Sequence, residues 1–226
     1  GSCYKQIGKL KDAIESYEWA VAYNHDFYQA YNNLASVYSE IGNIDQALDN
    51  YESSLGINPK FIDAHFNLGI LYKEIGRKQD SITSFKKVLE ISPSNAEAHR
   101  NLGMIKTFKK NDSHIKKMIS ILNTENPSPS AKISLNFALS KAFEDLKDYK
   151  KQFQFLENGS KLKKEILNYS IQIDKNRFSV LKKIFKRKPV ILEDKNVDLI
   201  KFKPIFIVGM PRSGTSLVEQ IISSHR

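Results

Sequence analysis

The chain has 226 residues, of which 41% are hydrophobic, and a formal net charge of +10. This length suits one large or two small domains, and the hydrophobic share argues against a wholly disordered chain. No apolar run approaches the roughly 20 residues of a membrane-spanning helix. The single cysteine, Cys3, excludes an internal disulfide bond and a cysteine-based metal cluster, so we expect it to be a small buried side chain and predict no metal site.

The first hundred residues contain an internal repeat with a period of 34. Small, leucine and aromatic positions recur in register, which is typical of stacked helix-turn-helix units. The recurring sets are Gly8, Gly42 and Gly76; Tyr4, Tyr38 and Tyr72; Leu34, Leu68 and Leu102; Ala30, Ala64 and Ala98; and Tyr17, Tyr51 and Phe85.

Within one unit, the pattern predicts two helices. Apolar residues recur at helical spacing over residues 28–41, and Gly42 stands where that helix should end. A second amphipathic stretch covers about 45–56, and the small residues Ala47 and Ser81 occupy positions where two helices must approach closely. Because one unit cannot cover its own apolar face, neighbouring units are expected to stack.

The segments YNNLASVYSEIGNIDQALDNYESSLGINP and FNLGILYKEIGRKQDSITSFKKVLEISP resemble the tetratricopeptide repeat. The resemblance implies a mainly α-helical solenoid over residues 1–108, in which the first helix of each unit lines a concave face. In this register residue 1 lies in the middle of a first helix, so we expect the array to begin inside a repeat.

Three asparagines, Asn33, Asn67 and Asn101, share one position of that first helix. An asparagine amide both donates and accepts, so it pairs with a peptide backbone whatever the side chains are. The resemblance to the asparagine ladder of O-GlcNAc transferase repeats implies a groove that holds a protein or peptide. Purely local hydrogen bonding is the equal alternative. Residues expected nearby on this face are Gln29, Asn32, Asp63, Phe66 and Arg100.

After Leu102 the period slips. Residues 109–165 contain a proline-serine break and one more helix pair that is out of phase with the array, and residues 166–203 form a basic helical linker. Residues 104–203 hold 23 basic and 11 acidic side chains, against 10 and 13 in residues 1–103. A solvated helical surface explains this excess, and so does a field that attracts an anionic ligand. The stretch lacks the aromatic-glycine motif of an RNA-binding module, so no nucleic-acid partner is expected.

The last segment, 204–226, predicts a strand, a glycine turn and a helix, which aims backbone N–H groups at an anion. Gly209 and Gly214 have the spacing of a nucleotide-hydrolysing P-loop, but Thr215 replaces its lysine. Instead, PRSGTS resembles the 5′-phosphosulfate loop of sulfotransferases, most closely tyrosylprotein sulfotransferases and bacterial relatives with N-terminal tetratricopeptide repeats. The resemblance implies the opening of a P-loop-like α/β domain.

The same resemblance implies roles in binding 3′-phosphoadenylyl sulfate (PAPS), the sulfuryl donor. Arg212 would be catalytic, because its cation would face the bridging oxygen where charge builds as the sulfuryl group leaves. The alternative for Arg212 is a surface arginine in a turn, and Thr215 or Ser216 could simply cap the helix, which is compatible with the binding role. His225 is interpreted as a helix residue rather than a base. The loop residues expected to bind PAPS are Arg212, Ser213, Gly214, Thr215 and Ser216.

These features together predict a fragment of a tetratricopeptide-repeat sulfotransferase that moves a sulfuryl group from PAPS to an acceptor hydroxyl on a peptide or saccharide. The catalytic base and the 3′-phosphate site of that family lie in sequence beyond the loop, so we expect the 226-residue chain itself to be inactive. A non-enzymatic scaffold is the alternative from another class. A cytoplasmic location is expected.

Overall fold

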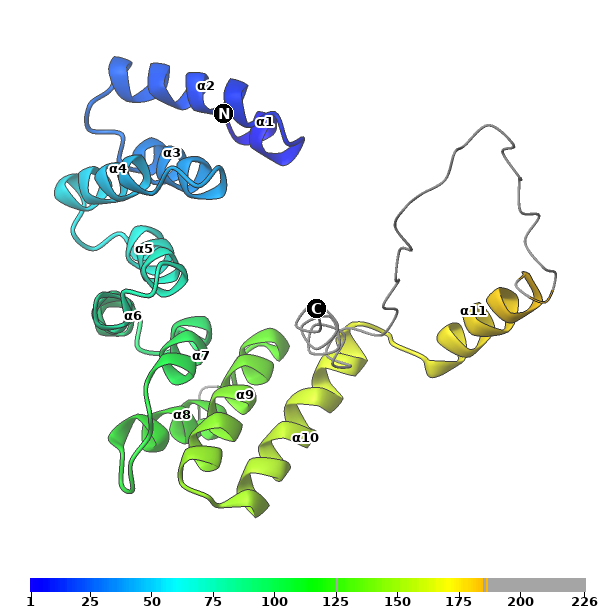
Figure 1. Ribbon diagram of the computed structural model, residues 1–226. Coiled ribbons are helices and arrows are strands. Elements are labelled where there is room, and N and C mark those ends of the chain that lie inside the picture. Colours follow the sequence, from blue (N-terminus) through cyan, green and yellow to red (C-terminus); the bar gives the residue numbers. More distant parts are fainter. Residues whose placement is uncertain (125, 185, 187–226) are drawn as a thin grey trace, which may run out of the picture. The chain divides into compact units, whose positions relative to one another are not determined.

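The computed structural model describes residues 1–124, 126–184 and 186, and the chain divides into two compact units, residues 1–170 and 171–226. In the first unit the described residues form helices that follow one another in chain order, with no strand among them (Figure 1). They are α1 Ser2–Gln6, α2 Leu10–Tyr23, α3 Tyr28–Glu40, α4 Ile44–Ile57, α5 Ile62–Glu74, α6 Lys78–Ile91, α7 Ala96–Ile105, α8 Ser113–Thr124, α9 Pro129–Asp145 and α10 Tyr149–Ile166.

The helices of the repeat pack in pairs. Helix α3 packs against α4 and α5 against α6, and each pair meets the next through contacts between α4 and α5 and between α6 and α7. The helices predicted over residues 28–41 and about 45–56 correspond to α3 and α4, so this prediction is confirmed. The first unit is therefore a helical solenoid of the tetratricopeptide-repeat type.

Each turn between paired helices depends on a glycine in the left-handed region. Gly8, Gly42 and Gly76 have φ angles of +74°, +79° and +78°. A side chain in this region costs roughly 1–2 kcal/mol because its Cβ approaches the following carbonyl oxygen. The repeated glycine therefore ends the first helix of each unit and directs the chain into the second.

Gly42→Ala is accordingly expected to lower the free energy of unfolding by about 1 kcal/mol. Gly56 is the matched control, because it lies in the last turn of α4 without a left-handed φ and with open space where a Cβ would stand. Gly56→Ala should instead raise the free energy of unfolding by about 0.5–1 kcal/mol, since alanine restricts the unfolded chain and favours helix. Urea unfolding followed by circular dichroism measures both changes, and effects of equal sign would contradict this explanation of the turn.

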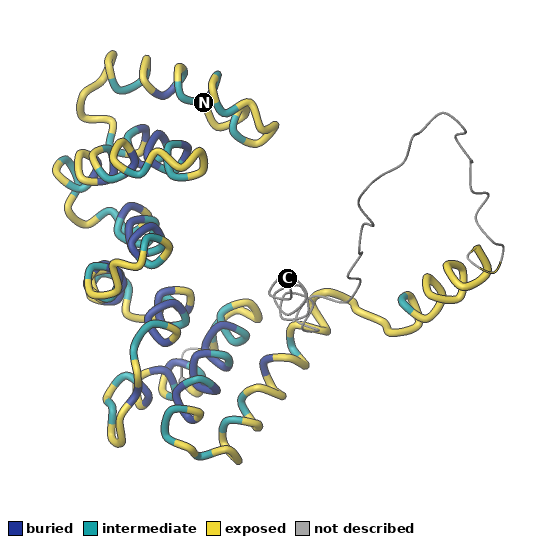
Figure 2. The backbone as a smooth tube through the Cα atoms, in the orientation of Figure 1, coloured by how far each residue is buried: buried dark blue, intermediate teal, exposed yellow. Residues whose placement is uncertain are grey.

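The core lies between the paired helices, where the buried residues concentrate in the repeats and in α9 (Figure 2). Ala47 and Ser81, predicted to stand where two helices approach closely, are fully buried, and Ser81 Oγ donates a 2.7 Å hydrogen bond to the Gly69 carbonyl. A Cβ added at Gly69 would lie 2.9 Å from the Phe85 ring. A small residue facing an aromatic ring is thus the packing rule that brings the two helices of a unit together.

The repeat geometry changes after α7, where the sequence predicted a slip. The position one period after Gly76 is Lys110, and the left-handed residue is Asn111, with φ +67°. Helix α9 packs directly against α7 and pairs with α10, while α8 joins their core through Ile115, Met118 and Ile121. The extended backbone of Lys106, immediately after α7, begins this different path.

Two histidines join α7 to α8. His99 is fully buried, and its Nε2 donates to the Pro93 carbonyl at 2.9 Å, which leaves Nδ1 as an acceptor. His114 Nε2 lies 2.6 Å from that Nδ1 and donates to it. The His114 ring stacks on Phe108, and its own Nδ1 is buried without a partner among the described residues. The pair therefore fits its site as two neutral rings.

The prediction that Cys3 is buried is wrong. The cysteine is exposed, because the five-residue helix α1 has no buried residue.

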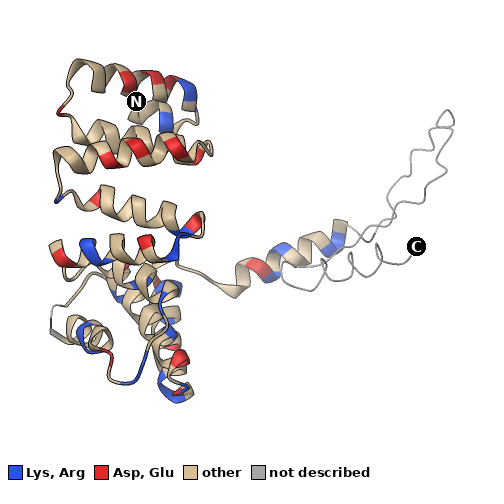
Figure 3. Cartoon of the chain, turned by 60° about the vertical axis from the view of Figure 1, so that its left-hand side comes forward, with Lys and Arg blue, Asp and Glu red and all other residues tan. Residues whose placement is uncertain are grey.

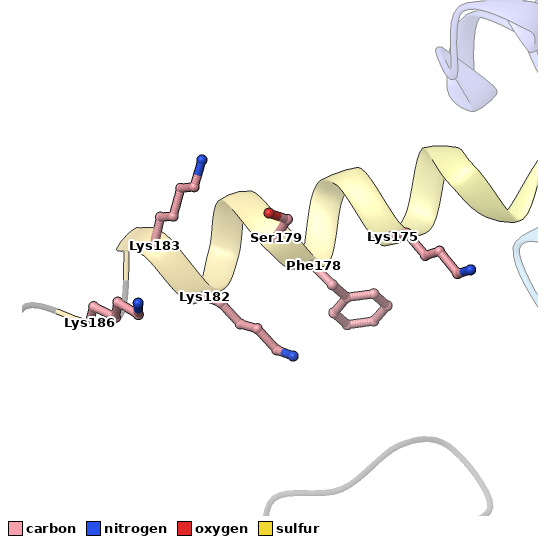
Figure 4. A pocket seen from close by; sticks show the side chains of 6 residues that line it. All are labelled: Lys175, Phe178, Ser179, Lys182, Lys183 and Lys186. Carbon is pink, nitrogen blue, oxygen red and sulfur yellow. The ribbon is translucent and has the colours of Figure 1, made fainter.

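In the second unit the described residues form helix α11, Ile171–Ile184, where a basic helix was predicted. No residue of α11 is buried, and among the described residues the hollow at its surface is lined by Lys175, Phe178, Ser179, Lys182, Lys183 and Lys186 (Figure 4). Basic side chains also appear on the later helices of the first unit, whereas acidic ones prevail on the early repeats (Figure 3). Among the described residues, no helix is long and apolar enough to cross a membrane.

Candidate functional site

Polar side chains connect the first helices of successive units. Each bridge joins one odd-numbered helix to the next, so together they form a polar layer from α1 to α9. The bridges are Lys5 Nζ to Ser36 Oγ (2.6 Å), Asn67 Nδ2 to Asn32 Oδ1 (3.1 Å), Lys73 Nζ to Asn101 Oδ1 (2.9 Å) and Ser134 Oγ to Glu97 Oε1 (3.2 Å).

The three predicted asparagines fall into two kinds. Asn101 is buried, and its amide is occupied on both sides, because Oδ1 accepts from Lys73 and Nδ2 donates to the Glu97 carbonyl at 3.0 Å. Asn33 and Asn67 are half-buried, and Asn32 lies between them, donating to Asn33 Oδ1 at 3.3 Å and accepting from Asn67. The structure therefore brings Asn33 and Asn67 together and places Asn101 in a different, internal role.

Asn33 and Asn67 keep hydrogen-bonding capacity. Among the described residues no hydrogen bond uses the Asn33 Nδ2 group or the Asn67 Oδ1 atom. One is a donor and the other an acceptor, which are the two groups that a peptide unit needs. The α3–α5 step is therefore the part of the layer that offers such a pair to a ligand.

A pocket opens at the same step. Its floor includes the buried Tyr51, whose pKa is raised to about 12, chiefly by burial, with the Glu74 charge acting in the same direction and a hydrogen bond with Ser36 opposing it. Two exposed carboxylates, Glu40 and Glu74, lie at its edge, so the pocket has a negative rim. The lining residues are Ser36, Ser39, Glu40, Tyr51, Asn67, Ile70, Leu71 and Glu74.

Sequence reasoning missed most of this pocket. Its asparagine, Asn67, was predicted, but Glu40 and Glu74 were not, although they too are one period apart. The lysine bridges were also missed, although Lys5 and Lys73 occupy one repeat position. The 34-residue repeat therefore contained a detectable pattern for both the two carboxylates and the two lysines.

The predicted donor loop belongs to the C-terminal segment of the chain. Residues 212–216, with His225, lie outside the described residues. In the part of the chain that the structure describes, no group of three or more histidine, cysteine, aspartate or glutamate side chains could hold a metal ion.

Comparisons with known proteins identify the repeats independently. A TPR repeat model matches residues 1–42 and 36–76, a tetratricopeptide repeat model matches 62–95, and a sulfotransferase family model matches 204–226. A relative from Aquifex aeolicus (strain VF5), described as an uncharacterized protein, is 35% identical over 122 residues. That alignment covers 54% of this chain, and it spans only 16% of the relative's length.

Solved structures share the helical architecture. The crystal structure of MamA has a TM-score of 0.55 at 16% identity over 74% of this chain and 95% of MamA. A tetratricopeptide repeat protein from Parabacteroides merdae ATCC 43184 has a TM-score of 0.58 at 20% identity, over 73% and 63% of the two chains. YrrB, a TPR protein with an unusual peptide-binding site, has a TM-score of 0.53 at 15% identity, over 71% and 81%. These comparisons establish that the chain carries tetratricopeptide repeats folded as an α-helical solenoid.

Proposed function

We propose that the face formed by α3 and α5 binds an extended segment of a partner protein. The observation that carries this proposal is the pair of unused amide groups on Asn33 and Asn67, beside a pocket at the same step. An extended segment has unpaired backbone donors and acceptors, and asparagine side chains satisfy them without regard to sequence. The tetratricopeptide repeats, which present side chains from a rigid helical scaffold, are consistent with this role.

The test begins with peptides selected for binding from a random display library. Asn33→Ala and Asn67→Ala should each weaken binding of a selected peptide by about five- to tenfold, the loss of one hydrogen bond to a ligand. Asn50→Ala is the matched control, because Asn50 lies on α4 and donates only to the Gln46 carbonyl. Fluorescence anisotropy measures the affinities. Equal affinities in all four proteins would remove the asparagines from the site.

A second function is proposed for the C-terminal segment: its PRSGTS loop binds the 5′-phosphosulfate end of PAPS, and the activity is sulfuryl transfer to an acceptor hydroxyl. The sulfotransferase family match over 204–226 favours it, together with Arg212 and the glycine turn in that match. As in phosphoryl transfer, such a site works by positioning and by stabilising charge on the leaving group. The repeats would then recruit the acceptor-bearing partner.

Titration with adenosine 3′,5′-bisphosphate tests this second function. In ¹H–¹⁵N spectra, the backbone amides of residues 212–216 should shift when the nucleotide is added, because these N–H groups are proposed to hold its 5′-phosphate. Arg212→Ala should abolish these shifts, and adenosine without phosphates should not cause them. Shifts elsewhere with no change at 212–216 would contradict the proposed loop.

A further inference from the structure

The steps on either side of the α3–α5 pocket each contain a lysine that reaches the next helix. Lys5, at the end of α1, donates to Ser36 Oγ at 2.6 Å and lies 3.9 Å from a Glu40 carboxylate oxygen. Lys73, at the end of α5, donates to Asn101 Oδ1 at 2.9 Å. The two lysines are two periods apart, so they occupy the same position of the repeat. At this position the lysine Nζ group donates to a side chain of the following unit.

The α3–α5 step lacks this lysine. The residue at the same repeat position is Ser39, whose short side chain lines the pocket. Glu74 is one period after Glu40 and would be the partner of a lysine at position 39. Among the described residues Glu74 forms no salt bridge, whereas Glu40 has Lys5. The repeat thus keeps the carboxylate but supplies no cation for it.

The surroundings favour a positive group with an apolar stem. Helix α3 ends at Glu40 and α5 ends at Glu74, and the C-terminal end of a helix carries partial negative charge. Ile70 and Leu71 line the same pocket and provide an apolar wall for the methylene groups of a long side chain.

We propose that this pocket receives the side chain of a lysine or arginine in the bound segment, with its cation at Glu74 and Glu40 and its stem along Ile70. This inference rests on the proposed peptide-binding function and adds a requirement for one basic residue. The ligand's cation would occupy the place that the chain's own lysines take in the two neighbouring steps.

The test selects peptides from one random twelve-residue display library, on the unmodified chain and on its variants, and compares them. Peptides selected on the unmodified chain should contain lysine or arginine at one aligned position. Ser39→Lys places the missing cation within the chain and should weaken a selected peptide at least tenfold, as should Glu74→Gln. Asp49→Asn removes an exposed carboxylate on α4, outside the pocket, and should leave the affinity unchanged.

The outcomes separate the two proposals. Selected peptides without a basic residue that still require Asn33 and Asn67 would overturn the cation pocket and leave the groove standing. Basic peptides whose binding ignores both Ser39→Lys and Glu74→Gln would also overturn the pocket. If selection yields no peptide on any of these proteins, both the groove and the pocket are overturned. Thermal unfolding measured by circular dichroism checks that each variant is folded. If Ser39→Lys does not fold, Ser39→Met fills the same space with an uncharged side chain and is used in its place.

Discussion

Phe85→Ala should lower the free energy of unfolding by about 3–5 kcal/mol, the usual cost of removing a fully buried phenylalanine. The Phe85 side chain is completely buried, and its ring meets Phe66 edge to face at 5.6 Å between centroids. It also packs in one cluster with Ala98 and Leu102 of α7, so it joins one unit to the next. In a repeat protein such interface contacts carry the coupling between units.

The measurement is urea unfolding followed by circular dichroism at 222 nm. Lys86→Ala is the control on the adjacent exposed position of α6 and should change the free energy of unfolding by no more than about 0.5 kcal/mol. We also expect the alanine variant at Phe85 to broaden the transition, because the loss falls at the junction between repeats. A change below about 1 kcal/mol would show that the ring does not hold this junction.

Acidification should destabilise the chain through the histidine pair. Burial lowers the pKa of His99, and burial, then His99 and Lys106, lowers the pKa of His114 to about 3. Lys117 also opposes a proton on either ring, and only Asp112 favours one on His114. In the unfolded chain a histidine titrates near pH 6.5. Below that pH the unfolded chain binds protons that the folded chain excludes, so the free energy of unfolding falls as the pH falls.

The expected slope is about 1.4 kcal/mol per pH unit for each excluded proton, and it begins below pH 6.5. Unfolding measured between pH 7 and pH 5 isolates it, because Asp112 and Asp145, whose pKa values are lowered, lose their contribution only below about pH 4. His114→Gln keeps a donor nitrogen for His99 but cannot titrate, so it should reduce the slope by about half. His25→Gln, at an exposed site, should leave it unchanged. A flat profile for the unmodified chain would contradict the neutral pair.

The repeat could be predicted because one periodic pattern encodes each of its elements. The left-handed turn requires a residue without a side chain, so Gly42 and Gly76 revealed the ends of α3 and α5. Close helix approach requires small residues, so Ala47 and Ser81 revealed the contact positions. Local propensity and packing therefore agreed within each unit, which makes a fold readable from sequence.

The site was only partly predictable because side-chain pairing depends on neighbours that the period does not specify. Asn33, Asn67 and Asn101 look equivalent in sequence, yet Asn101 is buried, and both its Oδ1 and its Nδ2 have partners in Lys73 and the Glu97 carbonyl. The path after α7 was equally hidden, since Asn111 takes the left-handed conformation that glycine takes elsewhere. In the first case a contact with Lys73, 28 residues away in sequence, sets Asn101 apart from the other two asparagines.

The central claim is that the α3–α5 face binds a peptide, and its most direct test is a ¹H–¹⁵N titration of the labelled chain with a display-selected peptide. We predict shifts in the side-chain amides of Asn33 and Asn67 and in the backbone amides of residues 36–40 and 67–74, with helix α6, which contributes no residue to the pocket lining, unaffected. Shifts confined to α4 and α6, with both asparagine amides unchanged, would contradict it.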